Sequence, residues 1–103
     1  MKSILEPQGS DACYVCGATG YLEEHHIFYG TANRKQSERA GLKVHLCLRC
    51  HRGSGTGIHG GNRELDIFLK QEAQRAYEQT HTRAEFMALI GRNYLEEQDE
   101  EYG

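Results

Sequence analysis

The strongest constraint on this chain is the spacing of its four cysteines. They form two C-x-x-C pairs, Cys13/Cys16 and Cys47/Cys50, with thirty residues between the pairs. Each pair lets two thiolates on one turn reach the same ion, and two such turns complete a tetrahedral structural zinc site. A redox C-x-x-C and two local disulfides are the alternatives, but a thioredoxin-like motif needs one pair in a βαβ context that is missing here. We therefore predict a structural Zn²⁺ on these four cysteines.

A structural metal also answers the weak apolar content of the chain. Only 38% of its 103 residues are apolar, it has no Trp and twelve glycines, and its mean hydropathy is −0.72. One domain of this length builds a small core, so folding energy from a bound metal would supplement burial. No stretch of about 18 apolar residues occurs, and Met1–Ser10 has no apolar run of signal-peptide length. We expect a cytoplasmic protein with no membrane contact. In the reducing cytoplasm, cysteines are more often metal ligands than disulfides.

The first half of the chain predicts two short strands. Aromatic and β-branched residues favour a strand over Tyr21–Tyr29, and Leu42–Leu46 is a second candidate. Between them, Gly30–Gly41 is polar and bounded by glycines, which is typical of an exposed loop or a partly helical excursion. The five glycines of Arg52–Gly61 require that any helix starting near Cys47 be short.

The second half predicts two helices that pack on the core. Apolar residues recur at helical spacing in Glu64–Thr80, with Asn62 as the candidate N-cap, and Thr82–Glu85 (TRAE) is a capping-box pattern before a second apolar stripe. We expect a loosely ordered lead-in over residues 1–10, with a short strand at Ile4–Leu5. A single domain follows over 11–95, comprising a core at 11–61 and a helical closure at 62–95, and an acidic tail covers 96–103.

Five of the six histidines fall between Glu24 and Gly60. Neighbours on a strand point to opposite faces, so His25 and His26 cannot both be ordinary core residues. The zinc site would bring this pair close to His51, where two imidazoles could hold a second, more exposed metal while a third takes a proton. A second structural zinc, or surface histidines without a role, are the alternatives that the residues leave open.

The formal charge of −3 argues at first against a nucleic-acid partner. However, seven basic residues and one acidic residue lie between Arg34 and Arg63, whereas two basic and seven acidic residues lie from Ala76 to the end. The histidines therefore fall in a basic stretch suited to phosphate contacts. The candidate phosphate-binding residues are Arg34, Lys35, Arg39 and Arg52.

Taken together, these motifs resemble a known enzyme family. The segments Glu24–Ile27 (EHHI) and Leu46–His51 (LCLRCH), with the first C-x-x-C upstream, are similar to the zinc-containing branch of the HNH, or ββα-metal, endonucleases. The likeness covers Cys13 to His59 and is nearest to small phage and prophage members. It implies an α+β fold, in which a small zinc-stapled ββα-metal finger, a two-stranded hairpin plus a short helix, is followed by two C-terminal helices.

The resemblance also implies the role of each histidine. His26 falls at the position of the general base, His25 and His51 fall at those of catalytic metal ligands, and His59 matches a less constant ligand or phosphate contact. The implied catalytic ion is Mg²⁺ or another divalent metal. The central Asn of the motif would fall on Leu42, so His45 or a backbone group becomes the candidate for orienting the base.

The expected activity is metal-dependent hydrolysis of DNA phosphodiester bonds. A homodimer, and contacts with phage or host recombination or packaging proteins, are further expectations. The competing hypothesis is a non-catalytic zinc-finger module that binds DNA or protein. It is disfavoured because no segment predicts a helix with a row of base-reading side chains.

Overall fold

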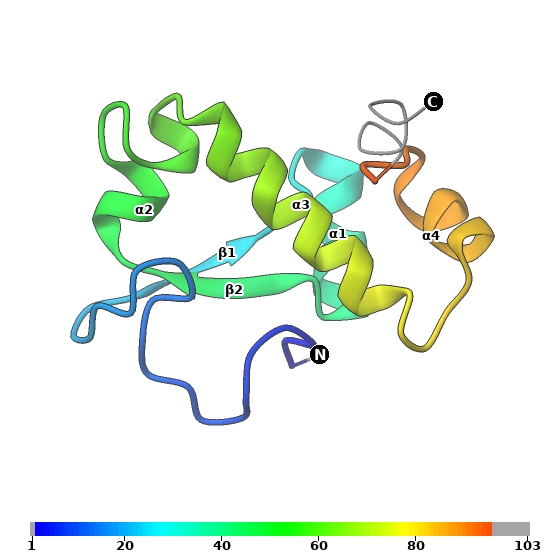
Figure 1. The fold of residues 1–103 in the computed structure, drawn as a ribbon, viewed down its shortest axis with the longest axis horizontal. Helices are drawn as coiled ribbons and strands as arrows, with labels where there is room; N and C mark the ends of the chain where they lie inside the picture. The colour runs from blue at the N-terminus through cyan, green and yellow to red at the C-terminus, as the bar shows by residue number, and fades with distance from the viewer. Residues whose placement is uncertain (1, 96–103) are drawn as a thin grey trace.

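The computed structural model describes residues 2–95, and over these the chain adopts an α+β fold with a two-stranded antiparallel sheet and four α-helices. The predicted acidic tail, 96–103, lies outside the described residues, as does Met1. In the view of Figure 1, α3 runs diagonally in front of α1, with α4 near one end of the molecule and α2 near the other. The elements in chain order are β1 Glu23–His26, α1 Thr31–Ala40, β2 Lys43–Leu46, α2 Leu48–Arg52, the 3₁₀ helix η1 Ile58–Gly60, α3 Arg63–Tyr77 and α4 Arg83–Ile90.

The sheet has one buried face and one polar face. His25 pairs with Val44, and both are buried, whereas His26 pairs with Lys43 on the opposite face. The alternation expected for the two adjacent histidines is therefore confirmed. Strand β1 is shorter than the predicted Tyr21–Tyr29, because the chain leaves the sheet after His26 to bury Ile27 and Phe28 in the core.

The segment between the strands is a ten-residue helix, α1, where an exposed loop or partly helical excursion was predicted. The bounding glycines that suggested a loop are its caps. Gly30 is the N-cap, and Gly41 is the C-cap with φ 73°, a left-handed conformation that favours glycine. The buried residue of α1 is the polar Ser37. The sequence of this helix therefore has no apolar periodicity from which it could be predicted.

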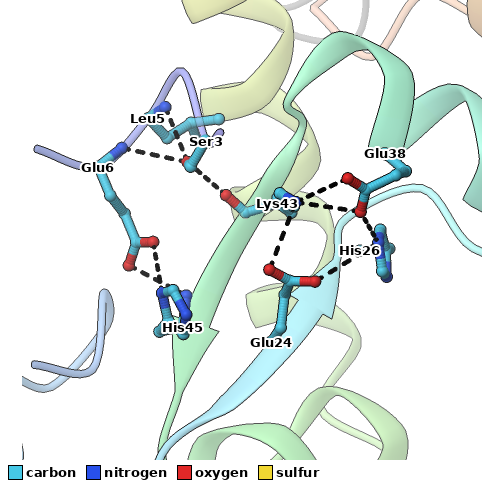
Figure 2. A network of polar contacts seen from close by, with 8 residues as sticks. All are labelled: Ser3, Leu5, Glu6, Glu24, His26, Glu38, Lys43 and His45. Atoms are coloured by element: carbon cyan, nitrogen blue, oxygen red, sulfur yellow. Dashed lines mark hydrogen bonds and ion pairs between the residues drawn. The ribbon is translucent and has the colours of Figure 1, made fainter. Parts of the chain in front are cut away.

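Residues 2–10 are held against the polar face of the sheet, although a loosely ordered lead-in was predicted. The Ser3 hydroxyl donates to the Lys43 carbonyl, and the Ile4 backbone N–H donates to the Gly41 carbonyl at 2.9 Å. The carboxylate of Glu6, with 4% of its side chain exposed, accepts from the His45 backbone N–H and contacts its ring (Figure 2). The expected strand at Ile4–Leu5 does not form; the described segment is bent there.

Local capping signals correctly predicted the two closing helices. The Asn62 side chain accepts from the Leu65 N–H at the start of α3, and Thr82 and Glu85 form the reciprocal capping box of α4. Both helices contribute to the core beside the buried sheet face. Its members are Cys13, Ile27, Phe28, Leu42, Val44, Leu46, Cys50, Ile58, Leu69, Ala73, Tyr77, Phe86 and Ile90.

Candidate functional site

The four cysteines come together as one cluster. One atom from each of Cys13, Cys16, Cys47 and Cys50 lies within 4.8 Å of the others, and all four are free thiols. The Sγ atoms of Cys16 and Cys47 are 3.7 Å apart. A zinc ion with bonds of about 2.3 Å would place tetrahedral sulfurs about 3.8 Å apart. The cluster is therefore compatible with a closed, four-thiolate zinc site.

The environment of the thiols also suits a cation. Burial raises the pKa of Cys13, but hydrogen bonds from the backbone N–H groups of Cys16, Cys47 and Val15 outweigh it and lower this pKa to about 7. Burial and the neighbouring sulfurs raise the pKa of Cys50. Four adjacent thiolates need a positive charge to coexist, and a coordinated metal supplies that charge.

A second cluster consists of three imidazoles. His25 from β1, His51 from α2 and His59 from η1 each place a ring nitrogen within 4.8 Å of the others. Their ring centroids are 4.9 to 5.3 Å apart. Burial, and then the charges of the other two rings, lower the pKa of His25 to about 3. At neutral pH its ring is thus neutral, the form that binds metals.

An unpartnered buried atom fits a metal at the histidine cluster. His25 is only 2% exposed, and its Nε2 atom is buried without a hydrogen-bond partner. The Nδ1 atom of His51 lies 2.8 Å from Glu23 Oε1, a contact that occupies this nitrogen and leaves Nε2 as the one available to a metal. Three imidazoles leave coordination positions open, as in catalytic sites.

The donor set bears on which ion the cluster would hold. Imidazole nitrogen suits zinc, nickel, copper or iron, whereas Mg²⁺ prefers oxygen ligands and retained water. Of the expected catalytic ions, Mg²⁺ or another divalent metal, Mg²⁺ therefore gains no support from these residues. A transition-metal ion is the better fit to His25, His51 and His59.

The glycine-rich loop after α2 returns His59 to the cluster. A side chain at Gly60 would collide with the Gly53 carbonyl, and a Cβ at Gly57 would lie 2.6 Å from the backbone nitrogens of Arg52 and Gly53. Only glycine lets these backbone segments approach so closely. The glycine run that limits the length of α2 therefore also makes the tight turn that positions His59, a candidate ligand.

His26 is set into a polar network on the other face of the sheet (Figure 2). Its Nε2 atom lies 2.9 Å from Glu38 Oε1 on α1 and 3.9 Å from Glu24 Oε1. Lys43 bonds both oxygens of Glu38, at 2.9 and 3.0 Å, and lies 3.4 Å from Glu24. Glu24, His26 and Glu38 form the third cluster of candidate metal ligands. The ammonium group of Lys43 already supplies a positive charge to the two carboxylates of this cluster.

A cleft of about 430 Å³ joins His26 to the histidine cluster. It is lined by Glu24, His25, His26, Tyr29, Gly30, Thr31, Arg34, His51 and His59. A neighbouring groove along α1 is lined by His26, Thr31, Arg34, Lys35, Glu38 and Arg39. Three of the four predicted phosphate-binding residues therefore border His26. The fourth, Arg52, is bonded to Glu23 at 2.7 Å.

The structure assigns a different contact to the predicted base-orienting residue. His45 Nδ1 lies 3.0 Å from Glu6 Oε1, because His45 stands opposite Glu24 in the strand register and faces the N-terminal segment. The described hydrogen bond of the His26 ring is made with Glu38 and not with His45. Leu42, at the position of the motif's central Asn, is fully buried in the core.

Three side chains near the cleft were not predicted from the sequence. Glu23 and Glu38 contact histidines that lie 28 and 12 residues away in the chain. The ring of Tyr29, whose hydroxyl donates to Asp66, packs 5.1 Å from that of His59. Glu23 directly precedes the EHHI segment, so its position in the sequence could have suggested a place near the site. The contacts of Glu38 and Tyr29 depend on tertiary packing.

No protein-family profile, curated protein or solved structure matches this chain. Within residues 2–95, none of the helices has the length and apolar character needed to span a membrane. The geometry of the two clusters and of the cleft is therefore what indicates a function.

Proposed function

We propose that this protein is a metal-dependent endonuclease of the HNH type that hydrolyses DNA phosphodiester bonds. The observation that carries the proposal is the juxtaposition, in one cleft, of His26 with three convergent imidazoles around an unpartnered buried nitrogen. The two strands pair antiparallel, α2 follows β2 and the cysteine cluster lies beside them, which supports a ββα-metal finger with helix α1 inserted between its strands.

The residues divide the work of hydrolysis among them. His25, His51 and His59 would hold a divalent ion, and that ion would supply positive charge against the negative charge that develops on the phosphate and the departing oxygen. His26 takes the proton from the attacking water as the general base. Arg34, Lys35 and Arg39 hold flanking phosphates along the α1 groove, contacts that carry little sequence information.

A plasmid-nicking assay of His26→Ala tests the proposal. Purified protein is incubated with supercoiled plasmid in Mg²⁺, Mn²⁺, Ni²⁺ or Zn²⁺. Loss of a general base lowers rates by about 100-fold to 10,000-fold, so the variant should lose nicking. Its circular dichroism spectrum and its zinc content should match the parent, because His26 lies outside the cysteine cluster.

His81→Ala is the matched control, because His81 stacks on Tyr77 at 4.0 Å and does not line the cleft. Cleavage by His26→Ala at the parental rate would show that the base is another group. One tight zinc per chain with no cleavage in any of the metals would instead favour the non-catalytic binding module.

A further inference from the structure

The ring of His26 is oriented by one carboxylate on the helix between the two strands. Its Nε2 atom lies 2.9 Å from Glu38 Oε1, and only 14% of its side chain is exposed. We propose that Glu38 is the positioning residue for His26: it accepts a hydrogen bond from Nε2–H and so leaves Nδ1 with the lone pair that takes a proton from water. This inference depends on the proposed nuclease function and names a residue that the motif does not supply.

The ionised state of Glu38 determines the direction of this hydrogen bond. The hydrogen bond from His26, and then those from Lys43, hold the pKa of Glu38 well below its usual range. An ionised carboxylate is only an acceptor, so His26 Nε2 must carry the hydrogen. In a neutral imidazole the other nitrogen, Nδ1, is then the acceptor.

The neighbouring polar groups are less suited to this role. Glu24 Oε1 is 3.9 Å from His26 Nε2, beyond hydrogen-bond distance. His45 is occupied with Glu6. Lys43 is itself a donor and faces the carboxylates, so it holds Glu38 in place rather than contacting the ring.

Glu38 would also account for the departure from the HNH pattern. The central Asn position falls on Leu42, whose side chain is fully buried among apolar residues and has no polar atom to offer. Glu38 lies four residues earlier and reaches the same histidine from α1. The orienting contact is thus supplied by the helix that lies between the strands.

Glu38→Gln is the sharpest test because it changes the hydrogen-bonding pattern without changing the size of the side chain. Glutamine has one oxygen, and the Lys43 ammonium, which can only donate, should take it. The amide NH₂ group would then face His26 Nε2 and move the ring proton to Nδ1. A general base held in the wrong tautomer should lower kcat by at least about 100-fold with KM unchanged.

The tautomer is measured separately from activity by long-range nitrogen-15 correlation NMR, with the His26 signals assigned by their loss in His26→Ala. We expect Nε2–H in the parent and Nδ1–H in Glu38→Gln. Adding Lys43→Met to Glu38→Gln frees the amide oxygen for His26, so the double variant should regain the Nε2–H tautomer and at least about tenfold in kcat. Glu78→Ala, which removes an ion-paired glutamate at the end of α3, controls for loss of charge.

The outcomes separate this inference from the proposed function. A parent protein that cleaves no DNA in any metal removes the nuclease proposal, and the catalytic purpose of Glu38 with it. A parent that cleaves, with Glu38→Gln unchanged in tautomer or in kcat, overturns the Glu38 assignment alone. A fall in kcat without the change of tautomer also overturns it, because Glu38 would then act in some other way.

Discussion

Ser37 joins helix α1 to the chain just after strand β1 through a buried hydroxyl. Its Oγ atom donates to the Phe28 carbonyl at 2.8 Å and accepts from the Phe28 N–H at 3.0 Å. The side chain is fully buried. Because Glu38 is the next residue, this contact helps to set the distance between α1 and His26. A single polar residue thus links the core to the candidate site.

Ser37→Ala should lower the free energy of unfolding by about 1–3 kcal/mol, because both backbone groups of Phe28 would be left buried without a partner. Urea unfolding followed by circular dichroism measures the change. Ser54→Ala, at an exposed position in the glycine-rich loop, is the control and should leave stability within about 0.5 kcal/mol of the parent. An equal effect of the two substitutions would rule out this role for the Ser37 hydroxyl.

At the scale of elements, the loop between α2 and α3 determines whether the histidine cluster has two members or three. Its glycines act in different ways. Gly60 is required by close backbone approach, whereas Gly55 has a φ of +73° and open space around the position of a Cβ. The close approach of Gly53 and Gly60 places η1, and with it His59, beside His51.

Gly60→Ala should therefore weaken divalent-metal binding at the histidine cluster. Displacing the backbone moves His59, and loss of one supporting contact typically costs about 10-fold to 100-fold in metal affinity. Titration calorimetry with Ni²⁺ on protein whose cysteine cluster already holds zinc gives the affinity. Gly55→Ala introduces left-handed strain of about 1 kcal/mol without a collision and should bind Ni²⁺ like the parent. Equal affinity in all three proteins would contradict this role of the turn.

At the scale of the whole molecule, the cysteine cluster connects distant parts of a small core. Cys13 lies on the turn before β1 and Cys50 lies on α2, and both belong to the buried cluster. The Tyr14 backbone N–H also donates to the His45 carbonyl, so the first cysteine turn is bound to the end of β2. Loss of a metal there would affect both the sheet and α2.

Cys47→Ser, or treatment with a strong chelator, should abolish cooperative thermal unfolding and most of the helical signal. The reason is that metal-binding energy at a structural zinc site is also folding energy. Circular dichroism and elemental analysis for zinc measure the two quantities together. His59→Ala is the contrasting variant, since it removes only a candidate ligand of the histidine cluster and should keep both the fold and one zinc per chain. A well-folded, zinc-free Cys47→Ser protein would contradict the structural role.

Local chemistry in the sequence was enough to predict much of this protein. The C-x-x-C pairs predicted a single thiol cluster, and the caps at Asn62 and Thr82 predicted α3 and α4, because these signals act over a few neighbouring residues. The alternation of His25 and His26 likewise follows from strand geometry. What remains a prediction is the zinc ion on the cysteine cluster and the chemistry of the cleft.

Only the tertiary structure decided which groups meet across long stretches of chain. Helix α1 carries no apolar stripe, so its position, and the meeting of Glu38 with His26, depend on packing between elements. Glu23 reaches His51 for the same reason, and close backbone approach in a turn brings in His59. The candidate metal ligands can therefore be predicted from short-range spacing in the sequence. Their orienting partners are selected by the way the helices pack on the strand pair, a property that no short stretch of sequence contains.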